Sequence, residues 1–304
     1  MLTVSLFNQF RKQNRMNSRF SIRIWTVMAF LAVMVAAGRS AEFATNSTAG
    51  PAVLPWEKGS VSFGAYLAAF NSNLGFGTKG AGVTVNAEQF LGLESTLSVF
   101  RANAMYRPGE TRRNQLDFTY AAYNRNGNGT LSEDFTVDGV TYPVGAQIDT
   151  TFNFDIIRGT YSYAVLQDDR IRLAFGGGIY VVPLHYSFSG QTTGGSTAVE
   201  GDYLTIPLPA FSYRGDFLLT PKLFLTTAID GMYLKISNFQ GSILDVSTGL
   251  EYRPWEHFGL GVQYASTSVY VEGQSNSSSY PGGGFVGTIS VRFTGLMFYG
   301  KYSF

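Results

Sequence analysis

The feature that most constrains this chain is an alternation with a period of two, which runs from roughly residue 60 to the last residue. Around Leu116, Phe118 and Tyr120, apolar and aromatic side chains occupy every second position, and Asp117 falls between two of them. Side chains alternate in this way along a β-strand, whereas an amphipathic helix repeats every 3.6 residues. Because no helical period appears after the first 55 residues, the pattern predicts an all-β chain.

Ten segments carry this alternation, and the connections between them alternate in length. Short connections such as Gln167–Arg170 would fall on one rim, and long ones such as 126–150 on the other. An even number of antiparallel strands with short turns at one end and long loops at the other is the plan of a transmembrane β-barrel. We therefore predict a closed antiparallel barrel of about ten strands, within a range of roughly eight to twelve. The ten segments are roughly 60–74, 94–106, 114–125, 151–166, 171–189, 203–219, 223–237, 242–253, 258–273 and 285–304.

Composition narrows the class of protein further. Only 14% of the residues are charged and 45% are hydrophobic, and the chain has 35 Gly, 25 Phe, 18 Tyr and no Cys. Soluble domains carry about 25% charged residues, so an ordinary cytosolic enzyme is disfavoured. A helical membrane protein is disfavoured too, because no apolar run reaches the ~20 residues that a spanning helix needs. The absence of Cys excludes disulfide scaffolds, thiolate metal sites and cysteine nucleophiles.

The distribution of charge between the two faces of each strand indicates which face meets lipid. The face that lacks large apolar residues carries Arg and Asp, and the apolar face carries almost no charge. A soluble barrel would have an apolar interior and a charged exterior. In lipid, however, the sheet must close on itself and its outer face must be apolar. We therefore expect the apolar face outside and the charged face in the lumen.

The first 41 residues have the order of a secretory signal sequence. A stretch rich in Arg and Lys precedes the apolar run Trp25–Ala37, and small residues follow it. This run is too short to span a bilayer as a helix. We expect cleavage between Ala37 and Ala41, with Met16 as an alternative start.

Cleavage would change the charge of the chain. Residues 1–41 hold six of the 22 basic residues and none of the 21 acidic ones, so the mature chain is acidic. It offers no basic surface of the kind that binds nucleic acid. We expect a periplasmic leader over 42–55 and the barrel over 56–304.

The chain ends on a strand with a distinctive pattern. On the face of the last residue, the apolar or aromatic side chains are Leu296, Phe298, Tyr302 and Phe304. This ending resembles the C-terminal signature that the barrel-assembly machinery of bacterial outer membranes reads. Upstream, Val291 and Phe293 take the opposite parity. This change of parity predicts a β-bulge of one residue at Thr294–Gly295.

Beyond its last strand, the chain resembles a family of bacterial outer-membrane barrels for which no substrate is known. The resemblance runs from about residue 56 to 304. It implies an integral barrel in outer-membrane lipid, with both termini in the periplasm, delivered by periplasmic chaperones and inserted by the barrel-assembly machinery. We expect a monomer. The segments that carry the resemblance are Leu91–Glu94 with Phe100–Arg101, Leu116–Tyr120, Tyr142–Gln147 and Tyr161–Arg170.

By parity, the lumen face holds a nearly balanced set of charges. Arg158, Arg172 and Arg214 lie on three neighbouring strands, so we expect them to pair with acids across the lumen. An eight-stranded barrel is already filled by side chains, and ten strands leave little more room. We therefore expect a closed or side-chain-plugged barrel with a structural or interaction role. The lumen set is Arg101, Asp117, Arg158, Arg172, Arg214, Asp216, Asp230, Asp245, Glu251, Arg292 and Lys301.

Two other functions remain open. A narrow channel or ligand-binding barrel for small polar or anionic solutes would use the same Arg side chains to attract its solute. A hydrolase or acyltransferase at the long-loop rim would need His185 as its general base, near Ser187. No Asp on that strand orients His185, and His257 lies in a turn at the opposite end. We rank the enzyme last and expect no catalytic residue, cofactor or metal.

Three local patterns have structural interpretations. Asn124–Gly129 imitates the first half of a calcium loop, but Phe135 stands where a Glu is needed, so we interpret the segment as turn residues. Pro207 and Pro209 cannot donate to a ladder, which predicts that the sixth strand starts late or bulges. Aromatic residues at the short-turn end predict an interfacial girdle. These aromatic residues are Trp56, Tyr106, Tyr252, Trp255 and Phe304.

Overall fold

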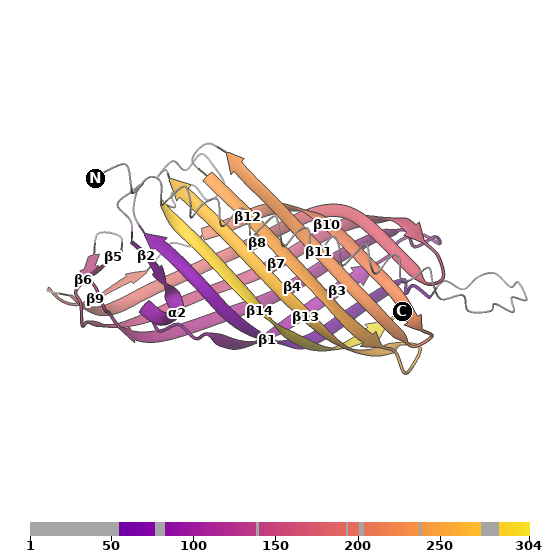
Figure 1. Ribbon diagram of the computed structural model, residues 1–304, viewed down its shortest axis with the longest axis horizontal. Helices are drawn as coiled ribbons and strands as arrows, with labels where there is room; N and C mark the ends of the chain where they lie inside the picture. The colour runs from indigo at the N-terminus through magenta and orange to yellow at the C-terminus, as the bar shows by residue number, and fades with distance from the viewer. Residues whose placement is uncertain are drawn as a thin grey trace, which may run out of the picture. The chain divides into compact units, whose positions relative to one another are not determined.

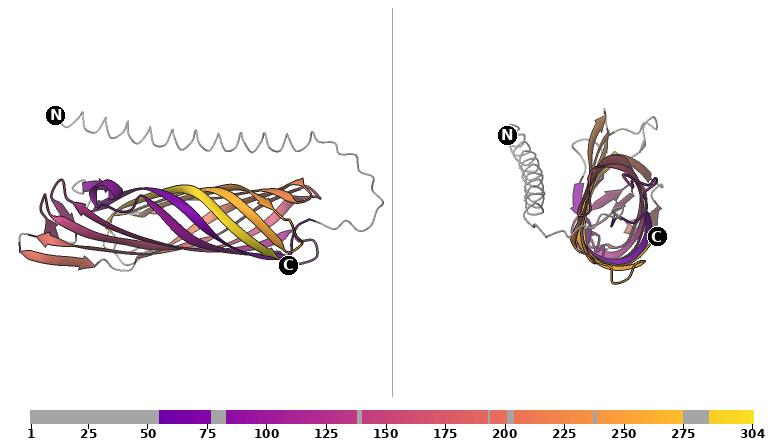
Figure 2. Two further views of the ribbon diagram at one scale, coloured as in Figure 1. Left: turned by 90° about the horizontal axis from the view of Figure 1, so that it is seen from below. Right: turned by 90° about the vertical axis from the view of Figure 1, so that its right-hand side faces the viewer.

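The computed structural model describes residues 55–76, 83–137, 140–192, 194–200, 204–236, 239–274 and 286–304. The expected signal sequence and most of the expected leader therefore lie outside the described residues. Within the described part, ten long strands pair antiparallel, each with the next, and β1 pairs with both β14 and β3. Figure 1 shows the strands running obliquely along the barrel, and Figure 2 shows the closed ring from one end.

The predicted closed antiparallel ten-stranded barrel is confirmed. The strands of the ring are β1 (Gly59–Phe76), β3 (Thr96–Tyr106), β4 (Asn114–Thr130), β7 (Gln147–Gln167), β8 (Ile171–Thr192), β10 (Leu204–Thr220), β11 (Leu223–Ile236), β12 (Phe239–Tyr252), β13 (Phe258–Gln274) and β14 (Val286–Ser303).

Short turns and larger connections separate the two ends of the barrel. Short turns such as 168–170 and 221–222 join strands at the end that holds the C-terminus, which we call the short-turn end. The opposite, long-loop end carries small elements that the alternation did not predict (Figure 1). No helix of the described part is long and apolar enough to cross a bilayer. The small elements are β2 (Val83–Asn86), α2 (Ala87–Phe90), β5 (Phe135–Val137), β6 (Val140–Tyr142) and β9 (Gly195–Glu200).

Near the short-turn end, the outward face of the barrel is an apolar and aromatic belt. Side chains this large and this apolar are unfavourable in water, and a closed sheet with an apolar exterior is what a bilayer requires. The expected orientation, with the apolar face outside, is therefore found in this half of the barrel. Exposed residues of the belt include Phe63, Leu67, Phe100, Tyr106, Leu116, Phe118, Tyr120, Tyr161, Tyr163, Val165, Phe175, Ile179, Leu219, Leu250, Tyr252, Phe258, Leu260, Val262, Tyr264, Leu296, Phe298, Tyr302 and Phe304.

Above the belt, the polarity of the two faces inverts. Phe70 pairs with Phe293 and Asn71 pairs with Arg292 in a β1–β14 ladder that has no register shift. The two Phe side chains are buried inside, whereas Asn71 and Arg292 are exposed outside. The predicted bulge at Thr294–Gly295 is therefore wrong, and so is the placement of Arg292 in the lumen. The parity changes because the barrel extends beyond its apolar belt, and in this outer half it has an apolar interior.

Four aromatic side chains from four strands form the centre of this outer core. Tyr123 stacks on Phe154 with ring centroids 4.7 Å apart, and Phe293 lies 4.9 Å from Tyr123 and 5.3 Å from Phe70. Aromatic pairs of this kind contribute about 0.5–1.5 kcal/mol each beyond the area they bury. We call these four residues the aromatic cluster.

Two further sequence interpretations are corrected by strand pairing. β10 begins at Leu204 and pairs with β8 through Pro207 and Pro209 without a shift. The prolines are tolerated because β10 pairs with β11 only from Phe211 onward, so their missing N–H groups cost no ladder bond on that side. The residues 124–129 lie in strand β4 and not in a turn.

The glycines of β4 allow a close approach of backbone. A Cβ at Gly127 would lie 2.6 Å from the carbonyl carbon of Gly92, and Gly92 itself has a φ of +66°. Leu93 forms a bridge to Gly127 at this point. Side chains at these positions would push the segment after α2 away from β4.

The absence of native Cys makes the inversion testable with single substitutions. In proteoliposomes with a water-soluble maleimide on both sides, Arg292→Cys should react, because this position faces outward above the belt. Phe298→Cys, on the same face within the belt, should be protected by lipid. The inward neighbour Phe293→Cys serves as the control and should be protected by packing. Labelling of position 298 with protection of position 292 would contradict the inversion.

Candidate functional site

The lumen of the belt half is crossed by ion pairs that centre on Asp230. Arg158 Nη1 donates to Asp230 Oδ2 at 2.8 Å, and Arg214 Nη1 donates to Asp230 Oδ1 at 2.9 Å. Tyr180 donates its hydroxyl hydrogen to Asp230 at 2.9 Å and also lies 3.1 Å from Asp245. Asp230 is 1% exposed, so both Arg side chains are held to an acid away from water. We call these five residues the Asp230 cluster.

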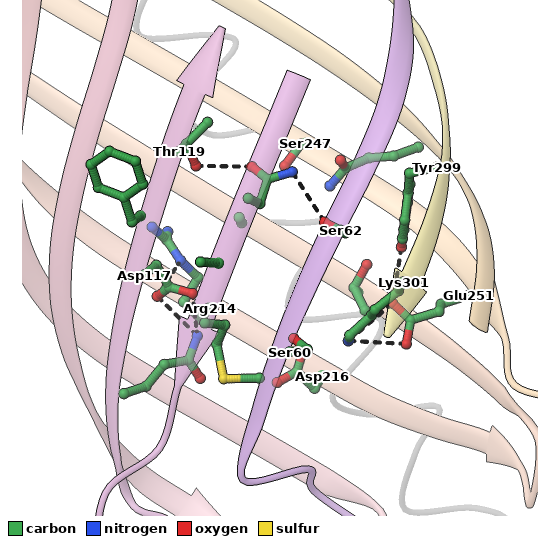
Figure 3. Close-up of a pocket in the computed structure, with 18 of the residues that line it drawn as sticks. Ser60, Ser62, Asp117, Thr119, Arg214, Asp216, Ser247, Glu251, Tyr299 and Lys301 are labelled. Atoms are coloured by element: carbon green, nitrogen blue, oxygen red, sulfur yellow. Dashed lines mark hydrogen bonds and ion pairs between the residues drawn. The ribbon is translucent and has the colours of Figure 1, made fainter. Parts of the chain in front are cut away.

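Arg214 and Asp230 lie on the paired strands β10 and β11, but other contacts join strands that are not neighbours in the ring. Arg158 lies on β7, whereas Asp230 lies on β11 and Asp245, 3.7 Å from Arg158, lies on β12. Arg214 on β10 also reaches Asp117 on β4 at 3.6 Å (Figure 3). Each of these contacts therefore reaches across the lumen.

A second network closes the short-turn end. Glu57 lies 2.6 Å from Lys301, 2.9 Å from Arg253 and 3.4 Å from Arg107. Glu251 accepts from Arg253 at 2.6 Å and from Lys301 at 3.1 Å, the latter visible in Figure 3. The network thus holds two acids among three bases. We call these five residues the turn network.

The turn network fixes the ionisation of Glu57, which precedes β1. Burial opposes ionisation and is the largest influence on this carboxyl group. The charges of Lys301, Arg107 and Arg253 together outweigh it and hold the pKa of Glu57 well below its ordinary value of 4.5. Glu57 is therefore ionised in the folded barrel at neutral pH.

Sequence parity missed three of these groups. Glu57, Arg107 and Arg253 lie just outside strands, so no alternation assigns them to a face. A weak signal was available, because Arg107 and Arg253 each precede a proline at the end of a strand. Trp56 was also misplaced. It is buried rather than part of a girdle, and its Nε1 donates to the backbone oxygen of Asp168 at 2.8 Å.

The remaining predicted lumen residues fall into three situations. Arg172 is fully buried and reaches Asp216 at 3.5 Å, and Asp216 also accepts from Arg107 at 3.0 Å. Arg101 faces the lumen but forms no ion pair with a described residue. Arg292 faces outward above the belt. Three neighbouring arginines were expected to share acids across the lumen, and Arg172 instead binds an acid of β10.

With the turn network included, the belt half of the described lumen holds seven basic and six acidic side chains, which we call the lumen charge set. The bases are Arg101, Arg107, Arg158, Arg172, Arg214, Arg253 and Lys301, and the acids are Glu57, Asp117, Asp216, Asp230, Asp245 and Glu251.

A polar cavity of about 160 Å³ lies between the Asp230 cluster and the turn network (Figure 3). Charged residues line it, and so do neutral hydrogen-bonding side chains. Asn103 donates to Ser62 Oγ at 3.3 Å and accepts from Thr119 Oγ1 at 2.9 Å. The cavity ends below the aromatic cluster, so it does not continue through the outer half.

The long-loop end is covered by a connection that folds inward. Phe135 and Tyr142 of the β5–β6 hairpin are buried, and Phe135 packs on the inward-facing Phe188 with ring centroids 5.4 Å apart. Beside the hairpin, Arg125 is fully buried between Phe70 and Glu88, with an ion pair of 2.6 Å to the latter. The hairpin and this ion pair close the end of the barrel over the aromatic cluster.

The histidine that a hydrolase at the long-loop rim would use lies on the outward face of β8. His185 lies on β8 opposite Asn153 of β7, at an outward position between the buried Leu184 and the core-packed Tyr186. No group of three or more His, Cys, Asp or Glu side chains in the described ranges is placed to hold a metal ion.

Comparison with known proteins finds solved structures of similar fold but no matching protein family. No protein-family model matches the chain, and no curated protein sequence matches it. Similar solved structures include the outer membrane protease OmpT of Escherichia coli, at 10% identity and a TM-score of 0.49 over 85% of this chain and 100% of that one. They also include outer membrane protein AlkL, at 15% identity and a TM-score of 0.37 over 86% of this chain and 97% of that one. Ail, the attachment invasion locus protein of Yersinia pestis, matches at 10% identity and a TM-score of 0.28 over 80% of this chain and 99% of that one. At these values the likeness carries no argument about activity.

Removal of the central acid tests the Asp230 cluster. Asp230→Ala should lower the free energy of unfolding by about 3–5 kcal/mol, because it leaves two buried arginines short of their nearest acid. Asp245→Ala should cost less, because its contact with Arg158 is longer and Asp230 remains. The exposed turn residue Glu256 provides the control, and Glu256→Ala should change stability by less than about 0.5 kcal/mol. Denaturant titration of the reconstituted barrel measures all three, and equal effects would contradict the assignment.

The turn network predicts a dependence on pH. Since the pKa of Glu57 is lower in the folded barrel than in the unfolded chain, its contribution is complete above pH 4.5 and is lost as pH falls through the folded value. The difference in free energy of unfolding between the native barrel and Glu57→Gln should therefore shrink as pH drops below 4.5. Denaturant midpoints at neutral and acidic pH measure it. A difference that stays constant or widens on acidification would refute the coupling.

Proposed function

We propose that the chain is an integral barrel of a bacterial outer membrane whose lumen is closed by its own side chains and which has a structural or interaction role at the surface. The observation that carries the proposal is the filled lumen. In the belt half, the Asp230 cluster spans it with ion pairs, and in the outer half the aromatic cluster and the β5–β6 hairpin follow in series. A solute would have to break both barriers.

The membrane assignment rests on the belt and on the ends of the chain. A secretory signal over 1–41 would deliver the chain to the periplasm, and an apolar belt on a closed barrel suits an outer membrane. The outward-facing Leu296, Phe298, Tyr302 and Phe304 would serve as the signal for the barrel-assembly machinery, after transit with periplasmic chaperones. Both termini would then lie in the periplasm, and the self-contained ring would be a monomer.

An extension beyond the bilayer supports a role at the surface. Above the belt the outward face becomes polar, as at Asn71, Asn124 and Arg292, while the interior remains packed. With the short-turn end in the periplasm, this half would stand outside the cell as a rigid platform. Its loops and hairpins would be presented to other molecules without any passage behind them.

A ligand-binding barrel for small polar or anionic solutes is the second candidate. The polar cavity between the Asp230 cluster and the turn network favours it. A hydrolase or acyltransferase using His185, which lies on the outward face of β8, is the third candidate, and the geometry of the described residues gives it no comparable support.

Planar-bilayer recording tests the closed lumen. The refolded mature chain, from about residue 42, should give no stable single-channel steps, whereas a general porin refolded in the same way should conduct. Stable steps whose size changes in Arg158→Ala would overturn the proposal, because they would show that ions pass the Asp230 cluster.

A further inference from the structure

One base of the lumen charge set has no acid. Six of the seven basic side chains lie within 4.0 Å of at least one carboxylate oxygen, and Arg101 is the exception among the described residues. The lumen charge set as a whole has one more positive than negative charge, since it has seven bases and six acids. A charge that is removed from water without a partner is unfavourable.

The side chain of Arg101 is buried and without a hydrogen bond. The residue is 7% exposed, its Nε has no partner, and no hydrogen bond joins the guanidinium group to any described residue. Its neighbours across the ladder are Gly64 on β1 and Ala121 on β4, which offer no polar side chain. The sequence thus holds an arginine between two small residues, where an acid would have neutralised it.

The acids that face Arg101 are already occupied. Asp245 lines the same small void as Arg101 but accepts from Tyr180 and Thr267 and lies 3.7 Å from Arg158. Asp117, lower on β4, is bound to Arg214 and Gln115. Either acid would have to give up these contacts to turn to Arg101.

Neutral hydrogen-bonding groups gather beside Arg101 in the polar cavity. Ser62, Asn103, Thr119, Ser247 and Gln263 line the cavity together with it. In Figure 3, Ser62, Thr119 and Ser247 lie in the upper part of the cavity, and Glu251, Lys301 and Asp216 lie below. The volume of about 160 Å³ is several times the roughly 10–15 Å³ that a single water needs by the same kind of measure. A small ligand and its waters can therefore fit.

We propose that Arg101 and this polar cavity bind a small oxyanion, either inorganic phosphate or a small carboxylate. A guanidinium group forms two parallel hydrogen bonds with an oxyanion, and the hydroxyl and amide groups supply further donors. One negative charge balances the lumen charge set. A cation would find no vacant acid and would meet Arg101. The inference deepens the ligand-binding candidate and rests on it. Glu57 and Arg107 of the turn network line the cavity on its short-turn side.

Calorimetric titration of the refolded mature barrel with inorganic phosphate tests the site. Saturable binding to one site is expected, and Arg101→Met should weaken it by about tenfold or more, since the charge-assisted bonds are lost. Arg292→Met, an outward arginine on β14, is the matched control and should bind phosphate normally. Phosphate should also raise the unfolding temperature of the native barrel, but not of Arg101→Met, beyond the effect of chloride at equal ionic strength.

A parallel titration with acetate distinguishes a site for phosphate from a site for a small carboxylate. Binding of phosphate, acetate or both supports the site and tells which class it takes. Should Arg101→Met fail to fold by heat-modifiable gel migration, Arg101→Lys keeps the charge, loses the paired geometry, and should still bind more weakly. Absence of saturable binding of either anion, or binding unchanged in the Arg101 variants, would overturn the proposal. Channel steps in bilayers would overturn the closed lumen alone, so the two failures are separable.

Discussion

In a bilayer, every backbone N–H and C=O needs a partner within the protein, and the rest of this structure follows from that requirement. The ten strands satisfy it only as a closed ring, in which β1 pairs with both β14 and β3. Closure sends every second side chain inward, where ten strands leave little space. The side chains at these positions must fill the lumen, and their polar and charged groups must find partners among one another.

In the belt half, the lumen is filled by charge. Burial of single charges is costly, but Asp230 between Arg158 and Arg214 offsets the cost with two short ion pairs and a hydrogen bond from Tyr180. Hydrophobic residues of similar size could fill the same space with less desolvation, so we expect the network to contribute specificity of register and position more than stability. In the outer half, where the exterior is polar, the interior is instead an apolar core like that of a soluble protein.

The alternation predicted the strands and the closed ring well, because parity reports directly which face a side chain occupies. It failed where the facing of a side chain depends on its position along the barrel axis, inside or beyond the lipid. Arg292 has the parity of the belt residues Leu296 and Phe298, yet it was assigned to the lumen because a polar side chain was expected to face inward everywhere. The position at which the barrel leaves lipid is a property of all ten strands together and cannot be read from one. The contacts of Glu57 were also out of reach, since residues in turns have no parity.

The most direct test of the account is a double-mutant cycle between Arg158 and Asp230, measured as the free energy of unfolding of the barrel in a lipid bilayer. The four proteins are the native chain, Arg158→Ala, Asp230→Ala and the double variant. If the two side chains meet across the lumen, the single effects should exceed additivity, and the coupling energy should be about 1–3 kcal/mol. Additive effects, with no coupling within error, would mean that the lumen is not spanned by this ion pair and would contradict the closed barrel described above.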